Sequence, residues 1–450
     1  MSMLSLFCLY YNLFMGIKNK YLTEIFQMAL PIILGNLGFI MIGVGDVIVA
    51  GRHSTQTLAA VSLATAITNC LMMLGIGILA SVSAILSNYR GEGKSVEKYF
   101  YPSLKFAMLL ACITSVLIFG IMPLIDKLRF GEVLTPIIKD YFFVTGFATF
   151  GAYLHCMAKE YLQSFEIVLF PNILNIFCIF LNLGLNILFV FGWKFIPSMG
   201  AVGLAIASLL TRYFMGIVLF AYCFKRIKIE KSSGNNKLYY KDILRVGLPA
   251  SLAIIVEFAA FNIVAVIMGR ISGIYAAAHN ILCTLTSVSF MIPLAVSNAL
   301  AVKVGFANGA KQYEELKKYA FTGMKVCAGF MACSAVFIGC FPELLIKLFT
   351  LDAELIKVCV PIVYVLCAFQ MFDGWQVSLS GIYRGIKKTK IVMVSNFITY
   401  WLIAFPLGCF LALKVGLNLM GFWISIGFSA IVLCTIMYII LLRYFKKMEI

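Results

Sequence analysis

Charged side chains are scarce in this chain of 450 residues, of which Asp, Glu, Lys and Arg together make up only 12%. Soluble domains typically carry about 25% charged residues, so the composition excludes an ordinary soluble globular protein. The 62% share of hydrophobic residues and the mean hydropathy of +0.99 agree with this exclusion. The chain is therefore expected to cross a membrane repeatedly, with roughly 20 mostly apolar residues in each span.

Signature motifs of energy-coupled and hydrolytic enzymes are also missing. The sequence contains no Walker motif, no G-x-S-x-G and no H-E-x-x-H, which argues against an ATP-driven pump or an intramembrane hydrolase. Histidine occurs three times, and the 14 cysteines are scattered in apolar runs without a C-x-x-C pair. We therefore expect neither an enzyme nor a resident cofactor, metal centre or disulfide framework.

Long apolar runs are what the chain does have. They predict twelve transmembrane helices, because each run is long enough to span the bilayer. A polar stretch at 225–241, KRIKIEKSSGNNKLYYK, separates six runs from the next six and is expected to be a cytoplasmic linker. The runs lie near 25–50, 58–88, 103–125, 136–157, 167–192, 200–224, two within 246–309, and then near 321–341, 358–382, 391–413 and 419–444.

The two groups of spans carry the same landmarks in the same order. Leu30-Pro31, Gly51-Arg52, Ala59-Ala60 and Gly91 recur as Leu248-Pro249, Gly269-Arg270, Ala277-Ala278 and Gly309, each at an offset of 218 residues. An even number of spans in each half makes the halves run in the same direction. The pattern predicts an all-α membrane protein of two six-helix lobes, 21–224 and 242–450, related by pseudo-two-fold symmetry along the membrane normal.

Basic residues set the expected orientation. The net charge is +17, and most of the 36 Lys and Arg residues fall in alternate loops, which predicts both termini in the cytoplasm. These loops are expected to meet anionic lipid rather than nucleic acid. The segment 1–20 lacks a basic start and a cleavage site, so we expect an interfacial or poorly ordered tail rather than a signal peptide. Lysine-rich loops without long soluble domains fit a bacterial inner-membrane protein.

Three acidic residues lie inside predicted spans: Asp46, Glu257 and Asp373. A charged side chain at the bilayer centre costs about 2.5–3.5 kcal/mol on insertion scales. Arg212 is the clear basic counterpart within the spans, so at least two of the acids are expected to lack a permanent ionic partner. Such a carboxylate can exchange a proton for sodium or for an organic cation. The alternative is structural, with each acid satisfied by a basic neighbour or by backbone donors.

Several stretches resemble the multidrug and toxic compound extrusion (MATE) transporters, in particular the NorM-like branch, over about residues 20–445. The first span LPIILGNLGFIMIGVGDVIVAGR, the seventh-span segment GLPASLAIIVEF, the tenth-span segment FDGWQVSLSGIYRG and the run NLGLNILFVFGWKFIPSMGAVGLAIAS carry this resemblance together. It implies twelve helices in two lobes around a V-shaped cavity, and export of cationic drugs in exchange for Na⁺ or H⁺.

The resemblance also assigns roles to residues. It implies that Glu257 and Asp373 form the coupling-cation site of the second lobe, which would hold Na⁺ if sodium is the coupling ion, and that Asp46 is a functional acid of the first lobe. NorM-like sequences often have tyrosine one turn before the tenth-span acid, where this chain has Phe369, which has no oxygen to coordinate a cation. The residues expected to line the cavity are Asn175, Asn182, Asn186, Phe369, Gln376 and Arg212.

Two other functions remain open at this point. A lipid-linked oligosaccharide flippase of the same superfamily would keep the fold, although three acids suit a pyrophosphate ligand poorly. A membrane receptor that transports nothing would tolerate exchange of the acids for amides. We expect small cationic organic substrates, a protein surrounded by the lipid bilayer, and a monomer. The sequence does not identify the substrate or decide between Na⁺ and H⁺ as the coupling ion.

Overall fold

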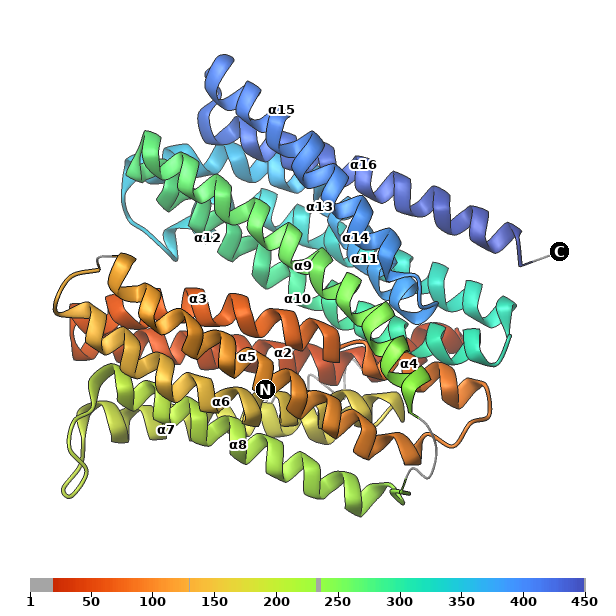
Figure 1. Ribbon diagram of the computed structural model, residues 1–450. Coiled ribbons are helices and arrows are strands. Elements are labelled where there is room, and N and C mark those ends of the chain that lie inside the picture. The colour runs from red at the N-terminus through yellow and green to blue at the C-terminus, as the bar shows by residue number, and fades with distance from the viewer. Residues whose placement is uncertain (1–18, 129, 232–235, 449–450) are drawn as a thin grey trace, which may run out of the picture. The chain divides into compact units, whose positions relative to one another are not determined.

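The computed structural model describes residues 19–128, 130–231 and 236–448. Helices account for nearly all of this part of the chain, as the coiled ribbons of Figure 1 show. The only extended pairing among the described residues is an isolated bridge between Trp193 and Ile196. The tail expected at 1–20 lies outside the described residues except for Asn19 and Lys20, and so does 232–235 of the expected linker.

The first half contains six long helical stretches, interrupted once. The second stretch breaks at Ala80-Ser81, so it consists of two helices, and short 3₁₀ turns begin and end the third. The elements are α2 (Lys20–His53), α3 (Thr55–Leu79), α4 (Val82–Gly91), η1 (Glu97–Tyr99), α5 (Phe100–Ile125), η2 (Asp126–Leu128), α6 (Leu134–Ser164), α7 (Leu169–Phe191) and α8 (Gly200–Arg226).

The described part of the second half also has six long helical stretches, with local differences from the first half. Its second stretch is unbroken, a short helix follows the third, and its fifth stretch alternates between α-helical and π-helical turns. The elements are α9 (Lys237–Ile271), α10 (Gly273–Gly309), α11 (Tyr313–Cys340), α12 (Pro342–Lys347), α13 (Ala353–Gly385), α14 (Thr389–Phe397), η3 (Ile398–Ala404, π-helical), α15 (Phe405–Cys409), η4 (Phe410–Lys414, π-helical) and α16 (Asn418–Lys446).

The expected all-α membrane architecture with about twelve long helices is confirmed. Eleven helical stretches of the described chain are long and apolar enough to cross a membrane. The twelfth, α6, has the required length but is more polar along its course, since it carries Lys139, Asp140, His155 and Glu160. Glu160 is buried and accepts a hydrogen bond from Ser83 at 2.6 Å, whereas Lys139 and Asp140 lie near the start of the helix, so α6 is compatible with a span despite its composition.

The chain forms two compact units whose boundaries fall inside helices rather than in the 225–241 stretch. One unit comprises 31–255, and the other comprises the described residues up to Leu30 together with those from Val256 onward. Helices α2 and α9 are therefore each divided between the two units. Both divisions lie within a few residues of the repeated prolines Pro31 and Pro249, which each remove a backbone donor from the helix.

The first part of α9 is packed tightly into the unit formed by 31–255. The hydroxyl of Ser251 donates to the carbonyl of Leu74 at 2.8 Å. A Cβ atom added to Gly77 would come within 2.8 Å of the Ser251 side chain, so glycine is what permits this close helix approach. Near the start of α9, Tyr89 donates to Asp242 at 3.0 Å.

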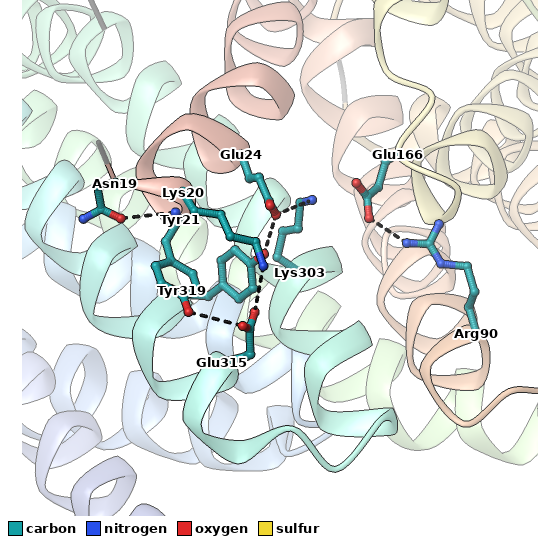
Figure 2. A network of polar contacts seen from close by, with 9 residues as sticks. All are labelled: Asn19, Lys20, Tyr21, Glu24, Arg90, Glu166, Lys303, Glu315 and Tyr319. Carbon is teal, nitrogen blue, oxygen red and sulfur yellow. Dashed lines mark hydrogen bonds and ion pairs between the residues drawn. The ribbon is translucent and has the colours of Figure 1, made fainter. Parts of the chain in front are cut away.

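The start of α2 is attached to the other unit by a polar network (Figure 2). The ammonium of Lys303 lies 3.0 Å from Glu24, and the Tyr319 hydroxyl donates to the same Glu24 oxygen. One turn earlier, Glu315 accepts from Tyr21 at 3.2 Å and pairs with Lys20 at 3.6 Å. Figure 2 also shows a separate pair in the 31–255 unit, Arg90 and Glu166 at 2.6 Å.

The two ion pairs of the α2 network should differ in their contribution to stability. Lys303 and Glu24 are 11% and 27% exposed, whereas Lys20 is 62% exposed. Lys303→Gln should destabilise the protein by roughly 1–3 kcal/mol because it removes the cationic donor of a partly buried carboxylate. Lys20→Gln should cost less than about 1 kcal/mol, since solvent already screens that pair. Thermal unfolding of the two purified variants checks this, and equal losses would contradict it.

Candidate cation sites

Glu257 lies near the middle of α9 and is surrounded by neutral hydrogen-bond donors. The Tyr400 hydroxyl donates to its Oε1 at 3.1 Å. The side-chain amides of Gln376 and Asn396 donate to its Oε2, each at 3.4 Å. These three donors come from η3, α13 and α14, and each of them is only 2% exposed. No Lys or Arg of the described chain forms an ion pair with Glu257.

Asp373 lies on α13 close enough to Glu257 for the two carboxylates to repel each other when both are ionised. It is one turn from Gln376 on the same helix, so the two residues share a face of α13. No side chain of the described residues donates a hydrogen bond to Asp373 in the structure. The structure therefore brings Glu257, Asp373 and Gln376 near one another, and their role as a coupling-cation site stays a prediction.

This arrangement concentrates negative charge without a fixed cation. Two ionised carboxylates in a poorly solvated position repel each other, and neutral donors offset only part of the cost. The site is therefore most stable when a proton or another cation is bound. Residues that can supply oxygen atoms to such a cation are Glu257, Asp373, Gln376 and Tyr400.

Tyr400 reaches the site from a widened stretch of helix. Within η3 the backbone N–H of Phe405 donates to the carbonyl of Tyr400, five residues earlier, which is the π-helical pattern. Pro406 follows directly, and a proline inside a helix excludes the usual bond to the carbonyl four residues before it. The proline thus accounts for the wider turns in this helix.

Phe369 lies one turn before Asp373, and its ring packs into the apolar core. A Cβ atom on Gly427 of α16 would clash with this ring, so the glycine makes room for it. Phe369 is 9% exposed and belongs to the same apolar cluster as Trp423. Because a phenylalanine side chain has no oxygen atom, Phe369 contributes no ligand to the site.

A second polar group surrounds Asp46 on α2, within the 31–255 unit. The Asn186 amide donates to Asp46 Oδ1 at 2.6 Å, and the Ser208 hydroxyl donates to Oδ2 at 3.5 Å. The same Asn186 amide also donates to Asn182 at 3.0 Å, and Asn182 in turn faces Thr211 at 3.5 Å. Helices α2, α7 and α8 therefore meet at one carboxylate.

Of the three asparagines on α7, only Asn186 contacts Asp46 directly, and Asn182 is linked to it through Asn186. Asn175 instead accepts a hydrogen bond at its Oδ1 from His155 Nε2 of α6 at 3.1 Å. Asn175 is two helical turns from Asn182, about 10 Å along the axis, which is too far for a shared carboxylate. Asn175 therefore belongs to a separate buried contact.

Arg212 lies near Asp46 without forming an ion pair in the described structure. Its guanidinium is close enough to attract the carboxylate electrostatically, while its Nη1 faces the sulfur of Met72 at 3.5 Å. Tyr141 of α6 is buried beside both charges. The acid near the interior arginine is thus Asp46, and the Glu257–Asp373 pair has no corresponding basic residue among the described ones.

Five residues of these two groups were not expected from the sequence: Tyr141, Ser208, Thr211, Asn396 and Tyr400. A periodicity signal existed for two of them, since Asn396 and Tyr400 are four residues apart in an otherwise apolar span. Ser208 and Thr211 are small polar residues of a kind that commonly hydrogen-bond within a helix. Among the described residues, no cluster of three or more His, Cys, Asp or Glu side chains could hold a metal ion.

Named proteins are similar to this chain over most of its length. A protein named probable multidrug resistance protein NorM from Acinetobacter baylyi is 25% identical over 437 residues, which cover 95% of this chain and 97% of that protein. A protein of the same name from Xanthomonas campestris is 28% identical over 411 residues and 89% of each chain. Full-length similarity of this kind extends across both groups of polar residues.

Solved structures share the fold. A crystal structure of MATE in the straight conformation matches with a TM-score of 0.87 over 96% of this chain and 98% of that one, at 18% identity. An outward-facing multidrug resistance MATE family transporter of the MOP superfamily matches with a TM-score of 0.85, also at 18% identity. At these identities the matches establish the architecture alone.

Taken together, the fold and its two acidic groups define an integral, multi-pass membrane protein of the type found among membrane transporters. The family model named MatE matches residues 31–188 and again 249–410. The chain belongs to the MatE family. The two matched segments correspond to the two halves of the repeat, and they contain Asp46 in the first and Glu257, Asp373 and Tyr400 in the second.

The hydrogen bond between Asn186 and Asp46 should be measurable as an energetic coupling. In a double-mutant cycle, Asp46→Asn and Asn186→Leu should show a coupling free energy of about 1.5–3 kcal/mol, because a charged acceptor strengthens the bond. Asn175→Leu on the same helix is the control and should add to Asp46→Asn within about 0.5 kcal/mol. Reversible unfolding in mixed detergent measures both cycles, and equal couplings would contradict the assignment.

Proposed function

We propose that this protein is a secondary active antiporter that exports cationic drugs or toxic organic compounds in exchange for Na⁺ or H⁺. The observation that carries the proposal is the pair of carboxylates at Glu257 and Asp373, which has neutral donors and no basic partner among the described residues. The names of the NorM relatives support drug export as the direction of transport.

Exchange follows from competition for this negative charge. A coupling ion that binds between Glu257 and Asp373 neutralises the pair and favours the conformation in which it is bound. A cationic substrate gains from the same negative charge when the coupling ion is absent. Each ligand then shifts the conformational equilibrium by its difference in affinity for the two states, which is the thermodynamic requirement for coupled exchange.

The Asp46 group would contribute in the first lobe. Its carboxylate is held by Asn186 and Ser208 and lies near Arg212, so its charge is more strongly compensated than that of the Glu257–Asp373 pair. We assign to Asp46 a role in proton coupling or in substrate release. The side chains expected to line the substrate cavity remain Asn182, Asn186, Gln376 and Arg212, together with Asn175 and Phe369.

The remaining assignments concern the surroundings of the protein. We place the two lobes at 21–224 and 242–450, with the linker 225–241 and both termini in the cytoplasm of a bacterial cell. The basis for this orientation is the distribution of Lys and Arg among the loops. A monomer in the inner membrane is sufficient for the proposed mechanism, because each acidic group is built from a single chain.

Removing either carboxylate should abolish export. Cells that lack their own efflux pumps and express Glu257→Gln or Asp373→Asn should retain a cationic dye as strongly as cells without the protein. The reason is that an amide carries no negative charge to attract the coupling cation. The amount of each variant in the membrane must match the wild type, as measured by immunoblot. Wild-type efflux from the double variant would rule out the assignment.

A control and an ion test complete this experiment. Glu343→Gln changes a side chain that is 61% exposed at the start of α12 and should leave efflux unchanged. Efflux by the wild type is compared with and without external sodium and with a protonophore. Stimulation by sodium would identify Na⁺ as the coupling ion, and indifference to sodium with loss upon protonophore addition would identify H⁺.

A further inference from the structure

Phe369 lies one turn before Asp373, packs its ring against Gly427 and supplies no oxygen to the Glu257–Asp373 site. A tyrosine from η3 reaches the site instead. The Tyr400 hydroxyl lies 3.1 Å from Glu257 Oε1 and within electrostatic reach of Asp373.

Tyr400 is fixed in this position by its neighbours. The next residue, Trp401, donates its indole N–H to the carbonyl of Val256 at 3.1 Å. Two adjacent residues of η3 therefore bind two adjacent residues of α9. The Tyr400 ring also lies 6.2 Å from the ring of Phe261, one turn further along α9. This double attachment holds the hydroxyl at the carboxylate without requiring a bound ion.

Gln376 presents a second neutral oxygen. Its amide nitrogen donates to Glu257 Oε2 at 3.4 Å, which fixes which end of the amide faces the carboxylate. Its carbonyl Oε1 is then buried, and no donor among the described residues reaches it. A buried acceptor without a partner is costly, at about 1–3 kcal/mol, so the structure contains an oxygen that a cation or water would stabilise.

We propose that Tyr400 and Gln376 complete the coupling-cation site at Glu257 and Asp373, and that they make it selective for sodium. This inference rests on the proposed antiport function and adds two residues to its site. Tyr400 acts through its hydroxyl, which positions Glu257 and offers its remaining lone pair to the ion, and Gln376 acts through its carbonyl oxygen. Together they add two neutral oxygens to the two carboxylates.

The chemistry favours sodium because a proton needs only one carboxylate oxygen. A hard metal cation requires several oxygen ligands at once. Four side chains, two charged and two neutral, provide them here from α9, α13 and η3. The neutral oxygens can bind the cation without adding negative charge to the site. Two more carboxylates would add such charge and increase the repulsion.

Equilibrium binding of radioactive sodium to the purified full-length protein tests this directly. Tyr400→Phe keeps the ring and removes only the hydroxyl, and it should weaken sodium binding roughly tenfold. Gln376→Met is a second variant of similar size and should weaken binding in the same direction. Tyr383→Phe is the matched control, since that buried hydroxyl donates to the Met437 carbonyl at 2.6 Å, away from the acids, and sodium affinity should be unchanged.

Dye efflux provides a second readout, which a purely structural role would not reproduce. Tyr400→Phe should raise the sodium concentration for half-maximal efflux by a similar factor while leaving the maximal rate close to that of the wild type. If sodium binds the wild type and both variants equally, the inference is wrong and the antiport function stands. If the wild type binds no sodium, the inference is also wrong, and proton-driven efflux then decides whether the antiport function survives.

Discussion

A carboxylate inside a membrane-spanning bundle requires a compensating charge, and the two acidic groups of this protein meet the requirement differently. Asp46 has a short amide hydrogen bond and an arginine nearby. Glu257 has three neutral donors, no described side chain donates to Asp373, and no basic side chain among the described residues forms an ion pair with either of them. In the proposed mechanism a mobile cation neutralises the second group, and the cost of its uncompensated charge is the physical basis of the proposed ion coupling.

The position of Glu257 in the fold connects this charge to the larger architecture. Helix α9 begins in the unit formed by 31–255 and passes into the other unit at Val256, directly before Glu257. Its first part is held by Ser251 against Leu74, and its later part by Tyr400 and Trp401. The proposed cation site thus includes a residue of α9 that directly follows the boundary between the two units in the sequence.

The sequence predicted the architecture well because apolar runs and basic loops are determined by the bilayer itself. The grouping of Glu257 with Asp373 came from family resemblance, since residues 116 positions apart reveal no proximity through periodicity. Tyr400 could not be anticipated in the same way, because its approach depends on the π-helical turn before Pro406, which changes the helix face locally. The unit boundaries inside α2 and α9 could not be predicted from the sequence either. A continuous apolar run does not show which helices each of its ends contacts.

The central claim is that substrate and coupling ion exchange at one negatively charged site. It is tested most directly by titrating the purified protein with a cationic dye while measuring sodium and protons released into a weakly buffered solution. The account predicts release of one of these ions in proportion to the dye bound, and no release from the variant that combines Glu257→Gln with Asp373→Asn. Dye binding that displaces neither ion from the wild type would contradict it.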